Sequence, residues 1–459
     1  MTDTSIGTPE QLRDPDYTPP LATAIPLGIQ HVMAMFASNV TPAIIIAGVA
    51  GFGFGSPNVD IAAVNYMVQM SILFAGIATL FKTIGFGPVG ARLPIVQGTS
   101  FAFLPVMIPA VAGAGVGGMA GLMTGVMIGG CFHFCLGFVI GRIRFALPPL
   151  VTGLIVLMIG LLLVKVGIQY AAGGAGEFNM SKPSWGGLEN WSMAITVIVV
   201  TMIVKFFAKG FLSAAAVLIG LIAGYLLAVS LGVVDFSKIG FAHGFGLPAP
   251  FHFGFEINWG IIIGMCLMAV VSAIETVGDT SGITKGGAGR EATTREITGA
   301  TFADGLGTAI AGVFGALPNT SFSQNVGLVA MTGIMSRGVV TIGAIFLVVC
   351  GLSPKLAAVV NTIPLPVLGG GVIVMFGMVA AAGVNMLSDV VWNRRNMMIF
   401  AVSLSIGLGL QQVPDALKFV GGTTEMLLST GLLPAAILAV LLNLVLPEEA
   451  VEDAVEEAA

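Results

Sequence analysis

The chain is built from long apolar runs that are separated by short polar stretches. A helix that crosses a bilayer needs about 20 mostly apolar residues, and the sequence contains fourteen candidate segments, several of them too short or too polar to be simple spans. They lie near residues 22–49, 64–84, 94–112, 115–141, 146–168, 190–208, 211–233, 256–282, 296–316, 322–335, 337–353, 364–386, 396–411 and 427–446. The pattern predicts an all-α polytopic membrane protein with fourteen transmembrane segments.

Composition supports a membrane protein. Of the 459 residues, 56% are hydrophobic and 9% are charged, whereas soluble domains carry about 25% charged residues. The net charge of −5 is partly carried by the end PEEAVEDAVEEAA, which we expect to be a solvated tail rather than a site for nucleic acid. The first 20 residues are polar and lack a basic region before a short apolar core, so no cleaved signal peptide is expected.

The basic residues indicate an orientation. With both termini inside, thirteen Lys and Arg residues, Lys82 among them, fall on the cytoplasmic side and five fall on the opposite side. This distribution agrees with the positive-inside rule. We therefore expect both termini in the cytoplasm and, because no transit peptide is recognised, a location in the plasma (inner) membrane.

Two pairs of similar stretches recur at an offset of seven segments. LPIVQGTSFAFLPV begins at Leu93 in segment 3, and LPNTSFSQNVGLV begins at Leu317 in segment 10. LPPLVTGLIVLMIG in segment 5 likewise matches IPLPVLGGGVIVMFG in segment 12. Because seven is odd, the second half must cross the membrane inverted relative to the first. Inverted repeats are typical of secondary transporters.

Segments 3 and 10 are short and interrupted, and segment 10 gathers polar side chains at positions 320, 321, 323, 324 and 325. We expect each to be a short extended stretch followed by a half-helix. The free amide groups and the positive dipole end of each half-helix would then face an interior site. Extended backbone at that depth is tolerated only where protein or a cavity satisfies it.

Few ionisable residues lie within the predicted spans. Glu275 and Asp279 are four residues apart in segment 8 and share a helical face, Asp304 lies in segment 9, and His31 follows Gln30 in segment 1. A carboxylate inside a membrane is costly, so a functional role is the default interpretation for Glu275 and Asp304. For Asp279 a capping role is an equal alternative, and a lone histidine such as His31 more often packs structurally.

Metal and cofactor chemistry are not indicated. Cys131, His133 and Cys135 resemble a ligand set at first, but on a helix the two cysteines share a face that the histidine does not, and no second pair follows. We expect no metal, no cofactor and no disulfide. The absence of a nucleophile–base arrangement argues against a membrane hydrolase, and the absence of a ring of like charges argues against a channel.

The polar stretch of segment 10 resembles a family signature. Gln324, Asn325 and Gly327, followed after four intervening residues by Thr332 and Gly333, are similar to the signature of nucleobase–ascorbate transporters. The Gln-His pair of segment 1 and the carboxylates of segments 8 and 9 resemble further positions of that family. The resemblance extends over residues 20–447.

This resemblance implies an architecture of two inverted seven-helix repeats that interweave into a core domain and a gate domain. It also implies an elevator-like movement of the core against the gate, a homodimer formed through the gate domains, and symport with protons or sodium. The implied divisions are a cytoplasmic tail at 1–20, core segments at 21–145 and 255–353, gate segments at 146–254 and 354–447, and an acidic tail at 448–459.

The resemblance further implies that Glu275 and Gln324 bind a nucleobase directly. The other implied site residues line the pocket or support it, and they are Ser100, Phe101, Phe322, Ser323, His31, Gln30, Asp279, Asp304 and Asn325. Elementary chemistry agrees, because a carboxylate accepts N–H groups while a primary amide both donates and accepts, which suits the edge of a purine dione. Phe101 and Phe322 offer stacking faces.

Within the family, Gln at the first signature position is similar to members that handle xanthine and uric acid. Ser100 is smaller than the Asn found in xanthine-selective members and leaves room for the C8 oxygen of uric acid. We expect import of xanthine, uric acid or both by proton symport, with Asp304 as the preferred proton carrier because Glu275 is needed as an acceptor. The alternatives are a uracil permease of the same family and a sulfate or bicarbonate exchanger of the same architecture, which Glu275 argues against.

Overall fold

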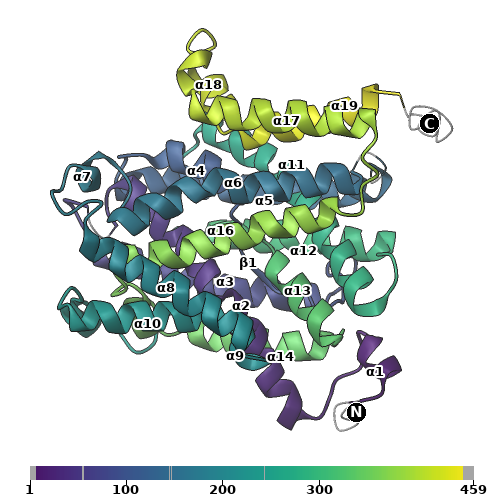
Figure 1. Cartoon of the computed structure of the whole chain (residues 1–459), viewed down its shortest axis with the longest axis horizontal. Helices are drawn as coiled ribbons and strands as arrows, with labels where there is room; N and C mark the ends of the chain where they lie inside the picture. The colour runs from purple at the N-terminus through teal and green to yellow at the C-terminus, as the bar shows by residue number, and fades with distance from the viewer. Residues whose placement is uncertain (1–6, 54–55, 144, 146, 242, 448–459) are drawn as a thin grey trace.

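A computed structural model describes residues 7–447 of the chain, apart from residues 54–55, 144, 146 and 242. It is mainly helical (Figure 1). The first half contains α1 (Pro9–Arg13), α2 (Leu21–Ala50), α3 (Ile61–Thr83), β1 (Gln97–Thr99), α4 (Leu104–Val111), α5 (Met119–Ile143), α6 (Pro149–Ala172), α7 (Glu177–Met180), α8 (Leu188–Phe207), α9 (Phe211–Ala214) and α10 (Ala216–Ser230). The second half contains α11 (Trp259–Ile283), α12 (Thr294–Val313), β2 (Asn319–Ser321), α13 (Ser323–Thr332), α14 (Arg337–Gly351), α15 (Pro354–Val360), α16 (Leu365–Leu387), α17 (Arg394–Gln412), α18 (Gly422–Leu428) and α19 (Leu432–Val445).

The helices α6 and α16 form the most extensive pair, and they begin with the two proline-containing stretches that repeat in the sequence. Proline suits a first helical turn because its missing N–H would have no partner there. Glycines allow the two backbones to approach closely. An added Cβ at Gly369 would lie 2.1 Å from the amide nitrogen of Ala171, and one at Gly383 would lie 2.3 Å from that of Leu157. Small residues at helix contacts are typical of packing in membranes.

The remaining helices pack in two groups. Around the first pair, α8 and α10 contact α16, while α17 and α19 contact α6. In the other group α12 packs on α5 and α3, α11 packs on α5, and α14 packs on α3 and α2. Figure 1 shows α6, α16 and α17 running in nearly the same direction across the molecule.

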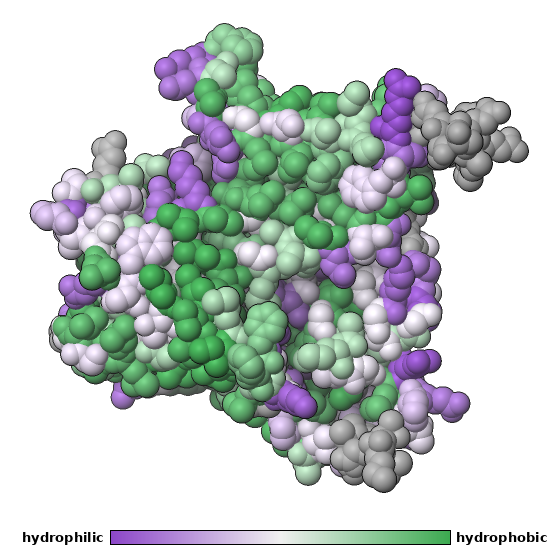
Figure 2. Space-filling model, in the orientation of Figure 1, coloured by the Kyte–Doolittle hydropathy of each residue, from purple (hydrophilic) through white to green (hydrophobic). Residues whose placement is uncertain are grey.

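The surface of the helices is largely apolar. Figure 2 shows hydrophobic residues across most of one face, with hydrophilic residues gathered mainly towards the ends of the long helices. Large side chains such as Phe138, Ile195, Leu226 and Val349 are exposed along the helices. A surface of this kind suits lipid rather than water.

The segment positions agree closely with the sequence analysis. Each of the fourteen predicted segments coincides with a helix or with a strand and its following helix. By length and composition, seven helices in the described part of the chain could cross a membrane, or up to nine if each of two bent helix pairs is one span. The exact number of fourteen crossings therefore stays a prediction.

Segments 3 and 10 are broken, which confirms the prediction. The strands β1 and β2 pair antiparallel, with Gln97 opposite Ser321 and Thr99 opposite Asn319, and they lead into α4 and α13 respectively. At Gly98, between them, an added Cβ would lie 2.4 Å from the Phe322 ring, so the crossing needs a glycine. Equivalent strand and half-helix units from the two halves thus meet head to head, as inverted repeats require.

The connection from α10 to α11 is attached to the ends of α3, α12 and α14. The Gln69 amide donates to the Gly246 carbonyl at 2.9 Å, and the Phe251 N–H donates to the Val313 carbonyl at 2.7 Å. The Tyr66 ring stacks on His252 with ring centroids 3.6 Å apart. We refer to residues 244–258 as the connector.

The N-terminal segment is partly docked rather than free. The Met335 N–H donates to the Leu12 carbonyl at 2.7 Å, and Arg337 pairs with Asp16 at 2.5 Å. In Figure 1, α1 and the end of α19 lie at the same, right-hand end of the long helices. The predicted acidic tail at 448–459 lies outside the described residues.

Candidate functional site

The backbone edges of the two crossing strands are satisfied by side chains. Asn39 accepts from the Thr99 N–H at 2.8 Å, Asn325 accepts from the Val96 N–H at 3.0 Å, and Thr79 accepts from the Gln97 N–H at 2.8 Å. On the second strand, Thr308 accepts from the Asn319 N–H at 3.0 Å. A two-stranded ribbon would otherwise leave costly unpaired groups inside the protein. These partners explain how extended backbone persists at the centre of an apolar molecule.

Asn325 connects this framework to His31. Its Oδ1 is used by Val96, so its Nδ2 is the donor to His31 Nδ1 at 2.7 Å. His31 Nδ1 is therefore an acceptor, and a neutral imidazole in this arrangement carries its proton on Nε2. Gln30 is buried beside it on α2. The predicted supporting roles of His31 and Asn325 thus correspond to a direct contact between α2 and α13.

Two carboxylates of α11 lie at the crossing. Asp279 Oδ1 accepts from the Ser323 hydroxyl at 2.8 Å, which ties α11 to the first turn of α13. Glu275 precedes Asp279 by one helical turn and is also buried. Among the described residues, Glu275 Oε2 and Asp279 Oδ2 have no hydrogen-bond partner, and neither do Ser100 Oγ and Gln324 Nε2. Gln97 Oε1 of β1 is unpartnered as well, and so are atoms farther away, such as both ring nitrogens of His133. Buried polar atoms are rarely left unpaired, so those at the crossing can take a water molecule or a ligand.

The half-helices bring the positive ends of their dipoles to the crossing. Neither α4 nor α13 has a side-chain cap at its first turn. The first amide groups of a helix have no partner within it, and they carry the positive end of the helix dipole. At α4 these groups are used or missing, because the Leu104 and Val106 N–H groups donate to the Phe101 and Phe103 carbonyls and Pro105 has no N–H. The contribution of the half-helices to this region is therefore mainly the positive end of each helix dipole.

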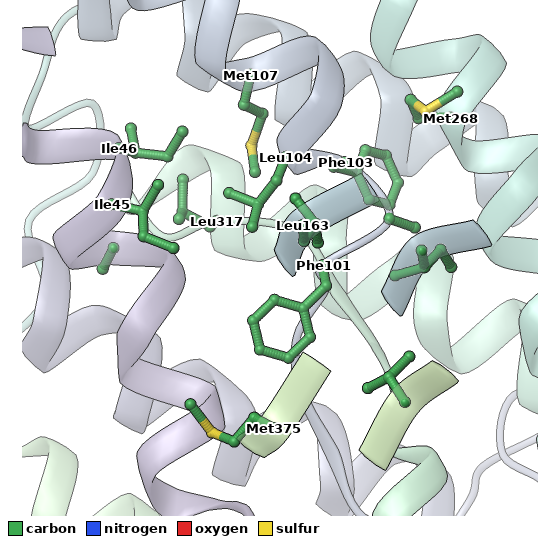
Figure 3. Close-up of a cluster of buried hydrophobic side chains, with 14 of the residues drawn as sticks. Ile45, Ile46, Phe101, Phe103, Leu104, Met107, Leu163, Met268, Leu317 and Met375 are labelled. Carbon is green, nitrogen blue, oxygen red and sulfur yellow. The ribbon is translucent and has the colours of Figure 1, made fainter. Parts of the chain in front are cut away.

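Aromatic rings form the apolar part of the crossing. The Phe101 ring packs edge-on against Phe376 of α16, with centroids 5.0 Å apart, and lies 6.3 Å from the Phe322 ring. Figure 3 shows the Phe101 ring between Leu163 and Met375. Phe101 and Phe322, both predicted at the site, are thus close together. Phe376 was not predicted, because one phenylalanine in a long apolar helix carries no distinguishing signal.

Asp304 is already fully engaged. Its Oδ1 accepts from Lys82 Nζ at 2.7 Å and from Gln97 Nε2 at 2.5 Å, and its Oδ2 accepts from the Thr276 hydroxyl. Lys82 and Asp304 are both completely buried. Lys82, counted above with the basic residues of the cytoplasmic side, is therefore a buried charge with a counter-ion. It lies in the last turn of α3, and its side chain turns inward to meet Asp304.

A cavity of about 700 Å³ reaches this region. It lies between α13 and the end of α11 on one side and α8, α10 and α16 on the other. Ser323 and Gln324 line it, whereas Glu275, Ser100 and Phe101 are buried and do not. Lys285 and Asp389, joined by an exposed ion pair of 2.6 Å, also line it. The cavity lies within the size range of small-molecule sites.

Metal ligation finds no support in the described part of the chain. No group of three or more His, Cys, Asp or Glu side chains is placed to hold a metal ion there. Cys131 and Cys135 are exposed on α5, whereas His133 is buried on another face. The histidine therefore points away from the two cysteines, as helical geometry predicts.

Comparison with known proteins places these features in a family. A model of the permease family matches residues 22–416. The chain belongs to this family. The permease is 33% identical to the xanthine permease XanP of Escherichia coli over 441 residues, which cover 94% of this chain and 93% of XanP. It is 34% identical to the uric acid permease PucJ of Bacillus subtilis over 422 residues, which cover 91% of each chain. The resemblance to nucleobase–ascorbate transporters is thereby confirmed.

Solved structures share the fold. The transmembrane domain of a cyanobacterium bicarbonate transporter, BicA, aligns with a TM-score of 0.55 at 18% identity, covering 92% of this chain and 97% of that one. SLC26A9 aligns with a TM-score of 0.57 at 13% identity, covering 84% of this chain and 62% of that one. The inverted-repeat transporter fold is thus confirmed. The permease is a multi-pass membrane protein, and its relatives are named as permeases rather than enzymes.

Proposed function

We propose that this permease imports xanthine, uric acid or both, and that the base binds where the two strands cross. The observation that carries the proposal is the group of unpartnered polar atoms there, Glu275 Oε2, Asp279 Oδ2, Ser100 Oγ and Gln324 Nε2. A purine dione offers N–H groups to the carboxylates and carbonyl groups to the amide. The names of XanP and PucJ, which match over most of their length, support this substrate class.

The cavity provides the route. It leads to Ser323 and Gln324 from one side of the molecule and separates the two groups of helices. We assign α2–α5 and α11–α14 to a core domain and the other long helices to a gate domain. With both termini in the cytoplasm of a plasma membrane, we assign the structure to an inward-facing state, because the cavity wall includes Met331 at the end of α13, close to Met335, to which the N-terminal segment is bound. Movement of the core along the gate would then expose the base to the other side, and the gate domains would join two copies in a homodimer.

We assign ion coupling to protons, and the contacts favour the two carboxylates of α11 over Asp304. Asp304 has an ammonium group and two further donors in contact. Glu275 and Asp279, in contrast, lie one turn apart, and no described cation contacts either of them. A proton on Asp279 would relieve the repulsion between them and leave Glu275 to accept from the base. Sodium remains the alternative coupling ion.

The competing functions would place different demands on the carboxylates at the crossing. A sulfate or bicarbonate exchanger would share the fold of BicA and SLC26A9, but the unpartnered carboxyl oxygens are acceptors that suit N–H groups, which a purine has and sulfate and bicarbonate lack. A uracil permease would share the crossing. Uptake of radiolabelled xanthine, uric acid, uracil and sulfate by cells that lack their own carriers tests all three. Saturable uptake of the purines alone supports the proposal, and uptake of sulfate or uracil alone overturns it.

Replacing Gln324 by glutamate should weaken xanthine and uric acid recognition. The carboxylate cannot donate to a base carbonyl, and an unsatisfied buried partner costs about 1–3 kcal/mol. Competition by unlabelled bases at equal membrane abundance measures the change. The same assay shows whether uracil becomes a ligand. Unchanged xanthine recognition would remove Gln324 from the site.

Replacing Ser100 by asparagine should shift preference from uric acid towards xanthine. Ser100 is completely buried next to Phe101, so a larger side chain would take the space that the C8 oxygen of uric acid needs. The ratio of the two uptake rates is the measurement, because a general loss of protein lowers both rates equally. A ratio that does not move would place the base elsewhere.

A further inference from the structure

The ion pair between Lys82 and Asp304 joins several of the elements that meet at the crossing. Lys82 Nζ also donates to the Ser321 hydroxyl of β2 at 2.5 Å. Through Asp304 the pair reaches Gln97 of β1 and Thr276 of α11. One ammonium and one carboxylate thus connect α3, α12, both strands and α11.

Each of these partners is a close neighbour of a site residue. Thr276 directly follows Glu275, Ser321 precedes Ser323 by two residues, and Gln97 precedes Ser100 by three. A shift of Lys82 or Asp304 would therefore be transmitted over one to three residues to the atoms that we assign to the base. Displacements of about 1 Å at a site can cost on the order of a hundredfold in rate.

The energetics of buried pairs favour a role beyond stability. Removing two charges from water is costly, and well-packed apolar residues often stabilise a protein as well or better. Buried pairs are best attested where they fix register or specify one arrangement. Here the arrangement is the pairing of two strands of three residues each. Strands this short share few backbone hydrogen bonds, so other contacts must hold them in register.

We propose that Lys82 is a positioning residue for substrate recognition. Held by Asp304, it fixes Ser321 on β2 and, through Asp304, Gln97 on β1 and Thr276 on α11. It sets the distance between the acceptor at Glu275 and the donor at Gln324. The proposal rests on the purine-binding function given above. Lys82 itself does not contact the base.

Three variants test it: Lys82→Met, the neutral pair Lys82→Met with Asp304→Asn, and Ser321→Ala. Ser71→Ala is the matched control, because Ser71 is a buried serine whose hydroxyl donates to the Met67 carbonyl of its own helix at 2.9 Å. The thermal midpoint of the purified carrier reports stability. The KM for xanthine and the maximal rate, measured separately at equal abundance, report positioning.

Ser321→Ala and the neutral pair should melt within a few degrees of the unchanged protein but bind xanthine about tenfold or more weakly, with Ser71→Ala unaffected. Lys82→Met alone should lose both stability and affinity. Normal KM in both the neutral pair and Ser321→Ala would overturn the assignment and leave a purely structural ion pair. If the neutral pair fails to fold, Ser321→Ala alone decides, because it leaves both charges in place. An unchanged carrier that takes up no purine would instead overturn the proposed function.

Discussion

Replacing Asp304 by asparagine should remove most of the folded permease from the membrane. The change leaves the ammonium of Lys82 buried without a counter-charge, and breaking one side of a buried ion pair costs about 3–5 kcal/mol. Membrane abundance and the thermal midpoint in detergent measure the loss. This expectation differs from that of a proton carrier, whose asparagine variant would fold normally and lose only its response to a pH gradient.

Asp389→Asn is the control for this prediction. Asp389 pairs with Lys285 at a similar distance, but both side chains are more than half exposed. Exposed ion pairs contribute about 0–1 kcal/mol, so this variant should remain near the unchanged thermal midpoint. If Asp304→Asn is as stable as Asp389→Asn, the permease does not depend on the Asp304 carboxylate to neutralise the buried Lys82 ammonium.

Replacing Glu275 by glutamine should weaken purine recognition strongly while leaving the fold intact. Glu275 Oε2 has no described partner, so the substitution breaks no hydrogen bond at that atom. A hydrogen bond to a charged group contributes about 1.5–3 kcal/mol, so losing one acceptor should weaken purine binding on the order of ten- to a hundredfold. Equilibrium binding of xanthine to the purified carrier measures the effect.

The aspartate variant provides the comparison for Glu275. Glu275→Asp keeps the charge and shortens the side chain, so it should bind more tightly than Glu275→Gln and more weakly than the unchanged protein. Equal binding by all three would show that the carboxylate does not meet the base. The thermal midpoints of the variants should agree, which separates a binding defect from a folding defect.

The sequence predicted the helical segments and both broken segments well, because these features are local. Apolar length marks the helices, and the paired Leu-Pro and Thr-Ser-Phe stretches mark the equivalent positions of the two halves. Proline and glycine at those positions correspond to the starts of α6 and α16 and to the crossing at Gly98. Polar residues in segment 10 were likewise visible as an anomaly in an apolar run.

The contacts between side chains that are far apart in the sequence could not be predicted from it. Lys82 and Asp304 are 222 residues apart, and no local pattern distinguishes a lysine that folds inward from one at a helix end. Asn39 likewise accepts a hydrogen bond from the Thr99 N–H, which lies 60 residues away in the sequence. The cavity also depends on tertiary packing, and it brings Ser323 and Gln324, but not Glu275, to its wall.

The attachment of the connector determines which part of the chain must bend if the core slides along the gate. Residues 246–252 are bound to Gln69, Tyr66 and Val313. The connector would therefore move together with α3 and α12 of the core domain. The link between the two domains then falls between the end of α10 at Ser230 and the first of these contacts at Gly246. The length of that stretch would limit how far the core can travel, so shortening it should restrict the stroke of the transporter without altering the site.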